Sequence, residues 1–90
     1  MFDYYAIVQI YEDGDTEIVL AEYTDAPEDL LTRFFKDLSA ESDQVQDYYC
    51  QYEYEVKCFS EFPEGVRRSL LKKYFPSHYS DLLQWEDEHK

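Results

Sequence analysis

The stretch MFDYYAIVQIYEDGDTEIVLAEYT, residues 1–24, decides the fold because it predicts a β-hairpin. Two runs of β-forming residues flank Asp13-Gly14, a dipeptide that favours a two-residue type I′ turn, in which both central residues take positive φ. A turn centred there aligns three pairs across the strands: Tyr4 with Tyr23, Ala6 with Ala21, and Val8 with Val19. These pairs would share one face of the sheet, because opposite residues of antiparallel strands point the same way.

The second face of this hairpin is also partly apolar. If helices covered only the first face, six large residues would stand open on the second: Tyr5, Ile7, Tyr11, Ile18, Leu20 and Tyr49. Tyrosines on an open face are typical of binding interfaces. The alternative is that a carboxyl-terminal helix covers this face.

Residues 47–58, DYYCQYEYEVKC, alternate with period two and therefore predict one long third strand. One side of this strand would carry β-forming residues, namely Tyr48, Cys50, Tyr52, Tyr54, Val56 and Cys58. The other side would carry most of the charges, with Asp47, Tyr49, Gln51, Glu53, Glu55 and Lys57.

Three segments predict helices. Residues 25–39 have an apolar stripe at helical spacing, with Asp25 as the expected N-cap and Pro27 in the first turn. A polar connection, SAESDQ, follows. The second helix is expected from about Pro63 with Val66, Leu70, Leu71 and Tyr74 inward, and the third over residues 76–90 with Ser77 or Ser80 as cap and Tyr79, Leu82 and Leu83 inward. The predicted fold class is α+β, a three-stranded antiparallel sheet with three helices in the order ββαβαα, as a single domain over residues 1–90.

The charge balance limits the class of partner. The chain has 21 acidic against 8 basic residues, a formal net charge of −13 and a pI near 4.2. Direct binding to nucleic acid or to an anionic membrane is not expected, because both require Lys and Arg to neutralise phosphates. The expected partner is a basic protein surface. The alternative is that the acidity serves only solubility.

The two cysteines indicate a reducing compartment. On one strand Cys50 and Cys58 would lie about 26 Å apart, too far for a disulfide, so we expect two buried, reduced thiols. The amino terminus has no basic region followed by a cleavage site, and no apolar run approaches the roughly 18 residues of a membrane span. These features predict a cytoplasmic protein.

The patterns of catalytic and metal sites are missing. Cys50, Cys58, His78 and His89 lack the close spacing of zinc ligands. A Cys–His nucleophile has no local support, and YEDGDTE is too short for a calcium-binding loop. Gly14 and Gly65 stand alone, so no phosphate-binding loop is predicted. We expect a protein that is not an enzyme, with no catalytic residue, cofactor or metal.

Acidic residues crowd two places, which are the candidate partner-binding site. The first is the hairpin tip, with Glu12, Asp13, Asp15 and Glu17; the second is the charged face of the third strand, with Tyr49, Glu53 and Glu55. Four cations, Arg67, Arg68, Lys72 and Lys73, fall within one predicted helix. We expect them to pair with acids of the same molecule.

In length, acidity and tyrosine content the whole chain resembles the small acidic phage proteins that counter host defence, including DNA-mimic anti-CRISPR proteins that block Cas effectors. The resemblance implies a non-enzymatic, stoichiometric inhibitor without a cofactor. Its acidic surface would mimic nucleic-acid charge in the cationic groove of a DNA- or RNA-handling protein. Two alternatives remain open: an immunity or antitoxin protein that neutralises a cationic nuclease, and a homodimeric scaffold protein in which the acids serve only solubility.

Overall fold

The computed structural model describes residues 1–88, apart from the side chains of residues 85 and 86. The chain divides into two compact units, Met1–Cys58 and Phe59–Lys90. The first unit contains an antiparallel three-stranded sheet with helices, which confirms the α+β class. The organisation as a single domain stays a prediction.

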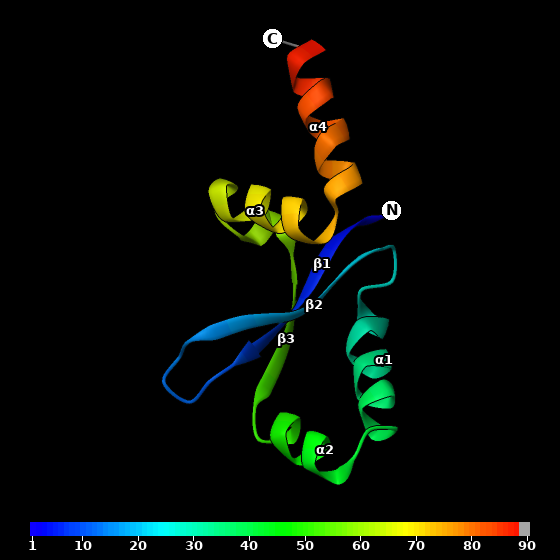
Figure 1. Ribbon diagram of the computed structural model, residues 1–90, viewed down its shortest axis with the longest axis vertical. Helices are drawn as coiled ribbons and strands as arrows, with labels where there is room; N and C mark the ends of the chain where they lie inside the picture. The colour runs from blue at the N-terminus through cyan, green and yellow to red at the C-terminus, as the bar shows by residue number, and fades with distance from the viewer. Residues whose placement is uncertain (89–90) are drawn as a thin grey trace. The chain divides into compact units, whose positions relative to one another are not determined.

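The sheet of the first unit is built around its amino-terminal strand. Strands β1 (Asp3–Ile10), β2 (Thr16–Thr24) and β3 (Glu53–Cys58) lie in the order β2-β1-β3, with both pairings antiparallel (Figure 1). The central position of β1 explains its burial: Ala6, Ile7, Val8 and Gln9 are each at most 2% exposed. The β-hairpin predicted from residues 1–24 is therefore confirmed.

The register of the hairpin differs from the prediction near its tip. Tyr4 pairs with Tyr23 and Ala6 with Ala21, as expected, but Val8 pairs with Ile18 rather than with Val19. The register shifts between Ile7 and Val8, which makes Val19 the extra residue of a β-bulge.

The turn itself causes this shift. The Tyr11 amide donates to the Asp15 carbonyl at 2.8 Å, and the Gly14 amide donates to the Tyr11 carbonyl at 3.0 Å. Within residues 1–88, Gly14 alone has positive φ, at 90°, so the two-residue type I′ turn is wrong. The loop has three residues, 12–14, and its last residue, Gly14, has a left-handed backbone conformation. The bulge at Val19 then restores the predicted register farther from the tip.

Helix α1 (Glu28–Ser39) packs on one face of the sheet. Leu30 is 1% exposed, and the Phe34 ring lies 5.3 Å from that of Tyr54 on β3. Ile7 shares this face with Val56, its partner on β3, and is 0% exposed. Of the two alternatives for this face, the open one therefore does not hold at Ile7, and the helix that covers it there is α1.

The start of α1 also corrects a prediction. The N-cap residue is Pro27, without a side-chain cap, so Asp25 is not the cap. A proline disfavours the helical conformation in the residue before it, which prevents the helix from extending back past Pro27. The hydroxyl of Thr24 instead accepts the Ala26 amide at 3.1 Å.

The long strand predicted over residues 47–58 is wrong in its first half. Helix α2 (Asp43–Cys50) occupies this part, and β3 begins only at Glu53. The Ser42 hydroxyl caps α2 by accepting the Val45 amide at 3.4 Å. Within residues 1–88 there are consequently four α-helices rather than three, in the order ββααβαα.

The second unit is helical. It contains a short 3-10 turn (Phe59–Glu61), α3 (Glu64–Tyr74) and α4 (Pro76–Glu88). Phe59 is 2% exposed, with its ring 6.0 Å from that of Phe75. No helix in the described part of the chain is long and apolar enough to cross a membrane.

The details of these two helices correct three expectations. Val66 and Leu83, predicted to point inward, are 44% and 40% exposed, whereas Leu71 is buried. Neither Ser77 nor Ser80 precedes α4, because Pro76 itself is its first residue. Proline is favoured in a first turn because its missing N–H would have no helical partner there.

A candidate protein-binding site at the hairpin tip

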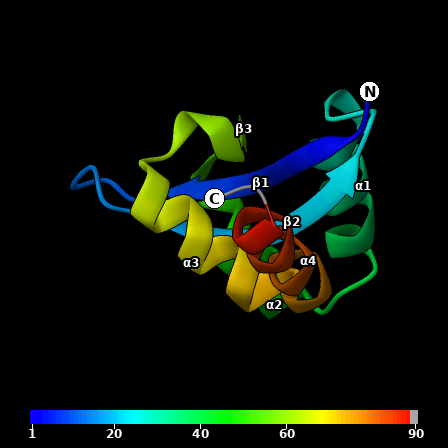
Figure 2. The same cartoon turned by 90° about the horizontal axis from the view of Figure 1, so that it is seen from above.

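The hairpin tip projects away from the helices of the first unit (Figures 1 and 2). Its four carboxylates belong to exposed residues: Glu12, Asp13, Asp15 and Glu17. The Asp13 carboxylate accepts the Asp15 amide at 3.0 Å, which braces the loop. The structure therefore brings together all four acids that the sequence predicts at this tip.

An open depression of about 970 Å³ lies against the tip. Nine residues line it: Tyr11, Glu12, Asp13, Gly14, Asp15, Thr16, Glu17, Gln51 and Tyr52. The last two come from the connection between α2 and β3. We call this hollow the tip depression. None of its lining residues is a cation, so its electrostatic potential is set by the four acids.

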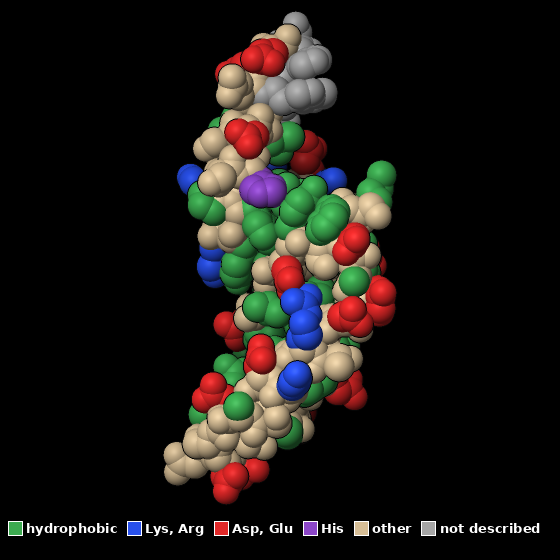
Figure 3. Space-filling view, turned by 90° about the vertical axis from the view of Figure 1, so that its right-hand side faces the viewer, with side chains coloured by type: hydrophobic (Ala, Val, Ile, Leu, Met, Phe, Trp, Pro, Cys, Tyr) green, Lys and Arg blue, Asp and Glu red, His purple; other side chains and the backbone are tan. Residues whose placement is uncertain are grey.

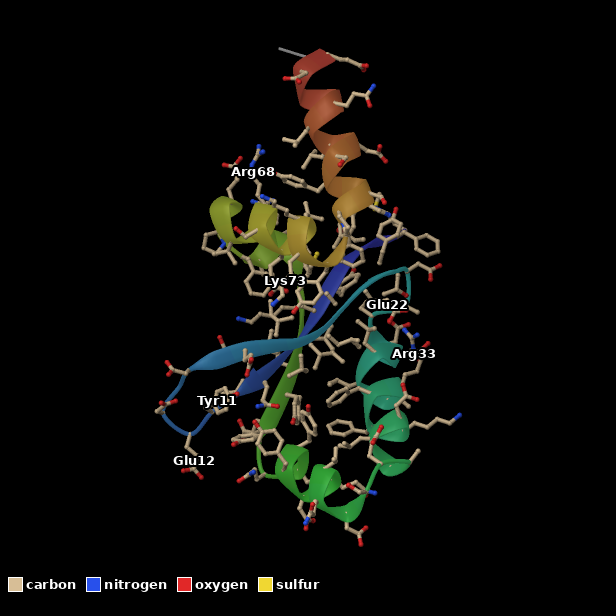
Figure 4. All side chains as sticks on the ribbon, viewed as in Figure 1. Tyr11, Glu12, Glu22, Arg33, Arg68 and Lys73 are labelled. Carbon is tan, nitrogen blue, oxygen red and sulfur yellow. The ribbon has the colours of Figure 1, made fainter. Side chains whose placement is uncertain are left out.

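Tyr11 links the tip to the sheet. Its hydroxyl donates to the Glu17 carboxylate at 2.6 Å (Figure 4 labels Tyr11). This hydrogen bond is the main reason that the pKa of Tyr11 is raised to about 12, with burial and the Glu17 charge adding to it and a hydrogen bond with Gln9 opposing it. The bond holds one carboxylate of the depression in a fixed position.

Aromatic rings continue from the tip toward α1. The Tyr11 ring contacts Tyr52 at 4.9 Å, Tyr52 contacts Tyr48 at 5.5 Å, and Tyr48 contacts Tyr49 at 5.0 Å. All three contacts are T-shaped. We call Tyr11, Tyr52 and Tyr48 the tyrosine row. Tyr52 and Tyr48 were not predicted in the site, because the period-two pattern of residues 47–58 places both on the face of a strand opposite Glu53 and Glu55.

A buried polar contact supports this end of the sheet. The Tyr54 hydroxyl donates to the Tyr49 carbonyl at 2.7 Å and lies 3.0 Å from the side-chain oxygen of Gln9, which is 1% exposed. Burial is the main cause that raises the pKa of Tyr54 to about 12. Because buried polar groups are costly unless they are hydrogen-bonded, these contacts fix how β3 and α2 meet.

The second predicted part of the site is divided. Glu53 and Glu55 are exposed on β3, opposite Ile10 and Val8 of β1, and share one face as expected. Tyr49 does not join them, because it lies in α2 with its ring 6.0 Å from Phe34. The prediction that these three residues form one strand face is wrong.

The cysteines also lie apart from their expected positions. Cys50 is exposed at the end of α2, and Cys58 is partly buried on β3 with its thiol 3.5 Å from an Asp3 carboxylate oxygen. Both are free thiols, but the prediction that both are buried on one strand is wrong. No metal-binding group of His, Cys, Asp or Glu occurs in the described residues, and His89 lies outside them.

Negative charge is concentrated in the first unit. Residues 1–58 contain 15 of the 21 acidic residues and only three basic ones, a formal net charge of −12, whereas residues 59–90 have −1. Figure 3 shows acidic side chains spread over the face around α1, with a short row of cations among them. The Arg33 guanidinium donates two hydrogen bonds to the Glu22 carboxylate, at 3.0 and 2.9 Å (Figure 4). The tip thus carries the densest group of acidic residues in a broadly acidic unit.

The cations of α3 are partly engaged within their own helix. Arg68 contacts Glu64 at 3.4 Å, one turn away, and the Lys73 ammonium lies 5.2 Å from the centre of the Tyr74 ring. Figure 4 shows Arg68 and Lys73 on different sides of α3. The expected pairing of this helix with acids of the same molecule is confirmed for Arg68.

Comparison of this chain with protein families, with curated proteins and with solved structures finds no match.

The raised tyrosine pKa values predict a loss of stability in alkali. Tyr11 and Tyr54 hold their protons to about pH 12 in the folded state, whereas an unfolded tyrosine ionises near pH 10. The folded state therefore binds more protons in this window, and the free energy of unfolding falls as pH rises from about 10 to 12. The melting temperature, followed by circular dichroism, should be lower at pH 11 than at pH 9.

Replacing Tyr11 by Phe separates this effect from other titrations. The Tyr11→Phe variant has no proton to lose at this position, so its melting temperature should fall less between the two pH values. An equal fall in the variant and the wild type would contradict the role of the Tyr11–Glu17 bond.

Proposed function

We propose that this protein is a non-enzymatic, stoichiometric inhibitor whose acidic first unit mimics nucleic-acid charge and occupies the cationic groove of a DNA- or RNA-handling protein, such as a CRISPR effector. The single observation that carries the proposal is the concentration of charge, −12 in residues 1–58, with four carboxylates at a projecting tip. Cationic grooves that bind nucleic acid are shaped to accept closely spaced negative charges.

The fold supports this proposal in two ways. The tip is held by backbone hydrogen bonds of the hairpin and by the Tyr11–Glu17 bond, so little ordering entropy is lost when it binds. The field of the whole unit would speed the encounter with a basic surface, while contacts at the tip would slow dissociation. Neither step requires a catalytic group.

Affinity capture from the lysate of a relevant host tests the proposal. The full chain is immobilised at low ionic strength, and bound proteins are eluted by raising the salt concentration and then identified. We expect the main captured species to be a basic nucleic-acid-binding protein, and added nucleic acid should displace it from the immobilised chain. Capture of a partner that nucleic acid does not displace would contradict the proposal. A cationic nuclease toxin as the partner would assign the immunity role instead.

A further inference from the structure

An exposed tyrosine contacts a residue that lines the tip depression. Tyr48 of α2 is 46% exposed, and its ring contacts Tyr52 at an interplanar angle of 73°. Tyr52 in turn lines the depression and meets Tyr11 at 68°. Tyrosine is enriched in protein-binding surfaces.

The two contacts within the tyrosine row are T-shaped, and Tyr48 at one end of the row is 46% exposed. In a T-shaped contact one ring presents its edge to the face of the other, so the first ring keeps both of its own faces for further contacts. Ring faces are electronegative and attract cations. Tyr11 and Tyr52 therefore add aromatic rings to the four tip acids in the same hollow, and Tyr48 adjoins it through its contact with Tyr52.

We propose that the tip depression binds arginine side chains of the partner, and that Tyr48 and Tyr52 make it prefer arginine to lysine. This inference rests on the proposed function, because it assumes that the acidic unit binds a cationic protein. It adds the chemical group that is recognised and the residues that recognise it.

Arginine fits this combination of groups better than lysine does. A guanidinium group is planar, donates two parallel hydrogen bonds to one carboxylate and stacks on aromatic rings, whereas an ammonium group is a compact and strongly hydrated point charge. A volume of about 970 Å³ is large enough for more than one side chain of a partner segment.

The same arrangement accounts for competition with nucleic acid. Arginines of nucleic-acid-binding proteins contact phosphates through their N–H groups and stack on unpaired bases through their planes. Carboxylates beside tyrosine rings offer a substitute for both. An arginine-bearing groove would then find at this tip a pattern of contacts close to the one it makes with a single strand.

Titration with two homopeptides tests the preference. An arginine peptide and a lysine peptide of equal length are titrated into the full chain by calorimetry at about 0.15 M salt, where long-range attraction is largely screened. We expect the arginine peptide to bind about fivefold more tightly, the ratio that a cation–π contact of about 1 kcal/mol provides. Tyr48→Leu should bring this ratio close to one, because the arginine peptide loses more affinity than the lysine peptide does.

Two variants serve as controls. Tyr48→Phe keeps the ring and should keep the preference. Tyr23→Leu removes a similarly exposed ring that packs against Phe2 and Tyr4, away from the lining residues, and should also keep it. Equal affinity of the wild type for both peptides, or an unchanged preference in Tyr48→Leu, would overturn the inference. Affinities for both peptides that do not change when the four tip acids are neutralised would also overturn it. The proposed function fails separately, if the captured partner is not displaced by nucleic acid while the tip keeps its preference for arginine.

Discussion

Replacing Ile7 by Ala should lower the free energy of unfolding by about 2–5 kcal/mol. Ile7 is 0% exposed on the central strand, on the face that α1 covers, so the smaller side chain leaves a cavity that the sheet cannot close. A domain of this size has only about 5–15 kcal/mol of stability in total. Urea denaturation followed by circular dichroism should therefore show a large shift of the midpoint.

Leu20→Ala is the matched control for this variant. Leu20 pairs directly with Ile7 across the hairpin and shares its face, but it is 37% exposed. Its truncation should cost no more than about 1 kcal/mol, since much of the side chain is already in water. An equal loss of stability in the two variants would mean that α1 does not cover the sheet at Ile7.

Neutralising the hairpin tip should weaken partner binding by about 100-fold, because several charged contacts are lost together. The variant replaces Glu12 and Glu17 by Gln, and Asp13 and Asp15 by Asn. These amides keep the shapes and the acceptor oxygens that Tyr11 and the Asp15 amide use. The fold should therefore be retained, and reduced self-repulsion should make it slightly more stable.

The control for the tip variant changes the net charge by the same amount elsewhere. Asp37, Glu41, Asp43 and Asp47 are exposed on or between α1 and α2, outside the tip depression. Converting these four to amides should weaken binding much less than the tip variant, because it reduces only the long-range field. Equal effects of the two variants would show that net charge, and not the tip, determines affinity.

The hairpin illustrates what the sequence could predict. Alternation of apolar residues around Asp13-Gly14 is enough to place two strands and to pair Tyr4 with Tyr23. The sequence does not distinguish a two-residue loop from a three-residue loop, because glycine suits both. The resulting one-residue shift, and the bulge at Val19 that compensates for it, follow from the three-residue loop.

Helix α2 shows the limit of periodicity in short segments. Residues 45, 48, 49 and 52 also have helical spacing, so the tyrosine-rich stretch fits both a strand and a helix. The signal that favours the helix is Ser42, an N-cap residue whose hydroxyl accepts the amide of Val45, three residues later. The tip acids could be predicted because they lie in the turn of the hairpin. Their neighbours Tyr48 and Tyr52 could not, because their stretch fits both a strand and a helix.

The measurement that bears most directly on the electrostatic account is the salt dependence of partner binding. The dissociation constant of the captured partner is measured from about 0.05 to 0.5 M salt for the wild type and for the tip-neutralised variant, a range over which the screening length shortens severalfold. We expect affinity to fall steeply with salt for the wild type and much less steeply for the variant. A wild-type affinity that hardly changes with salt, as expected for an apolar interface, would contradict it.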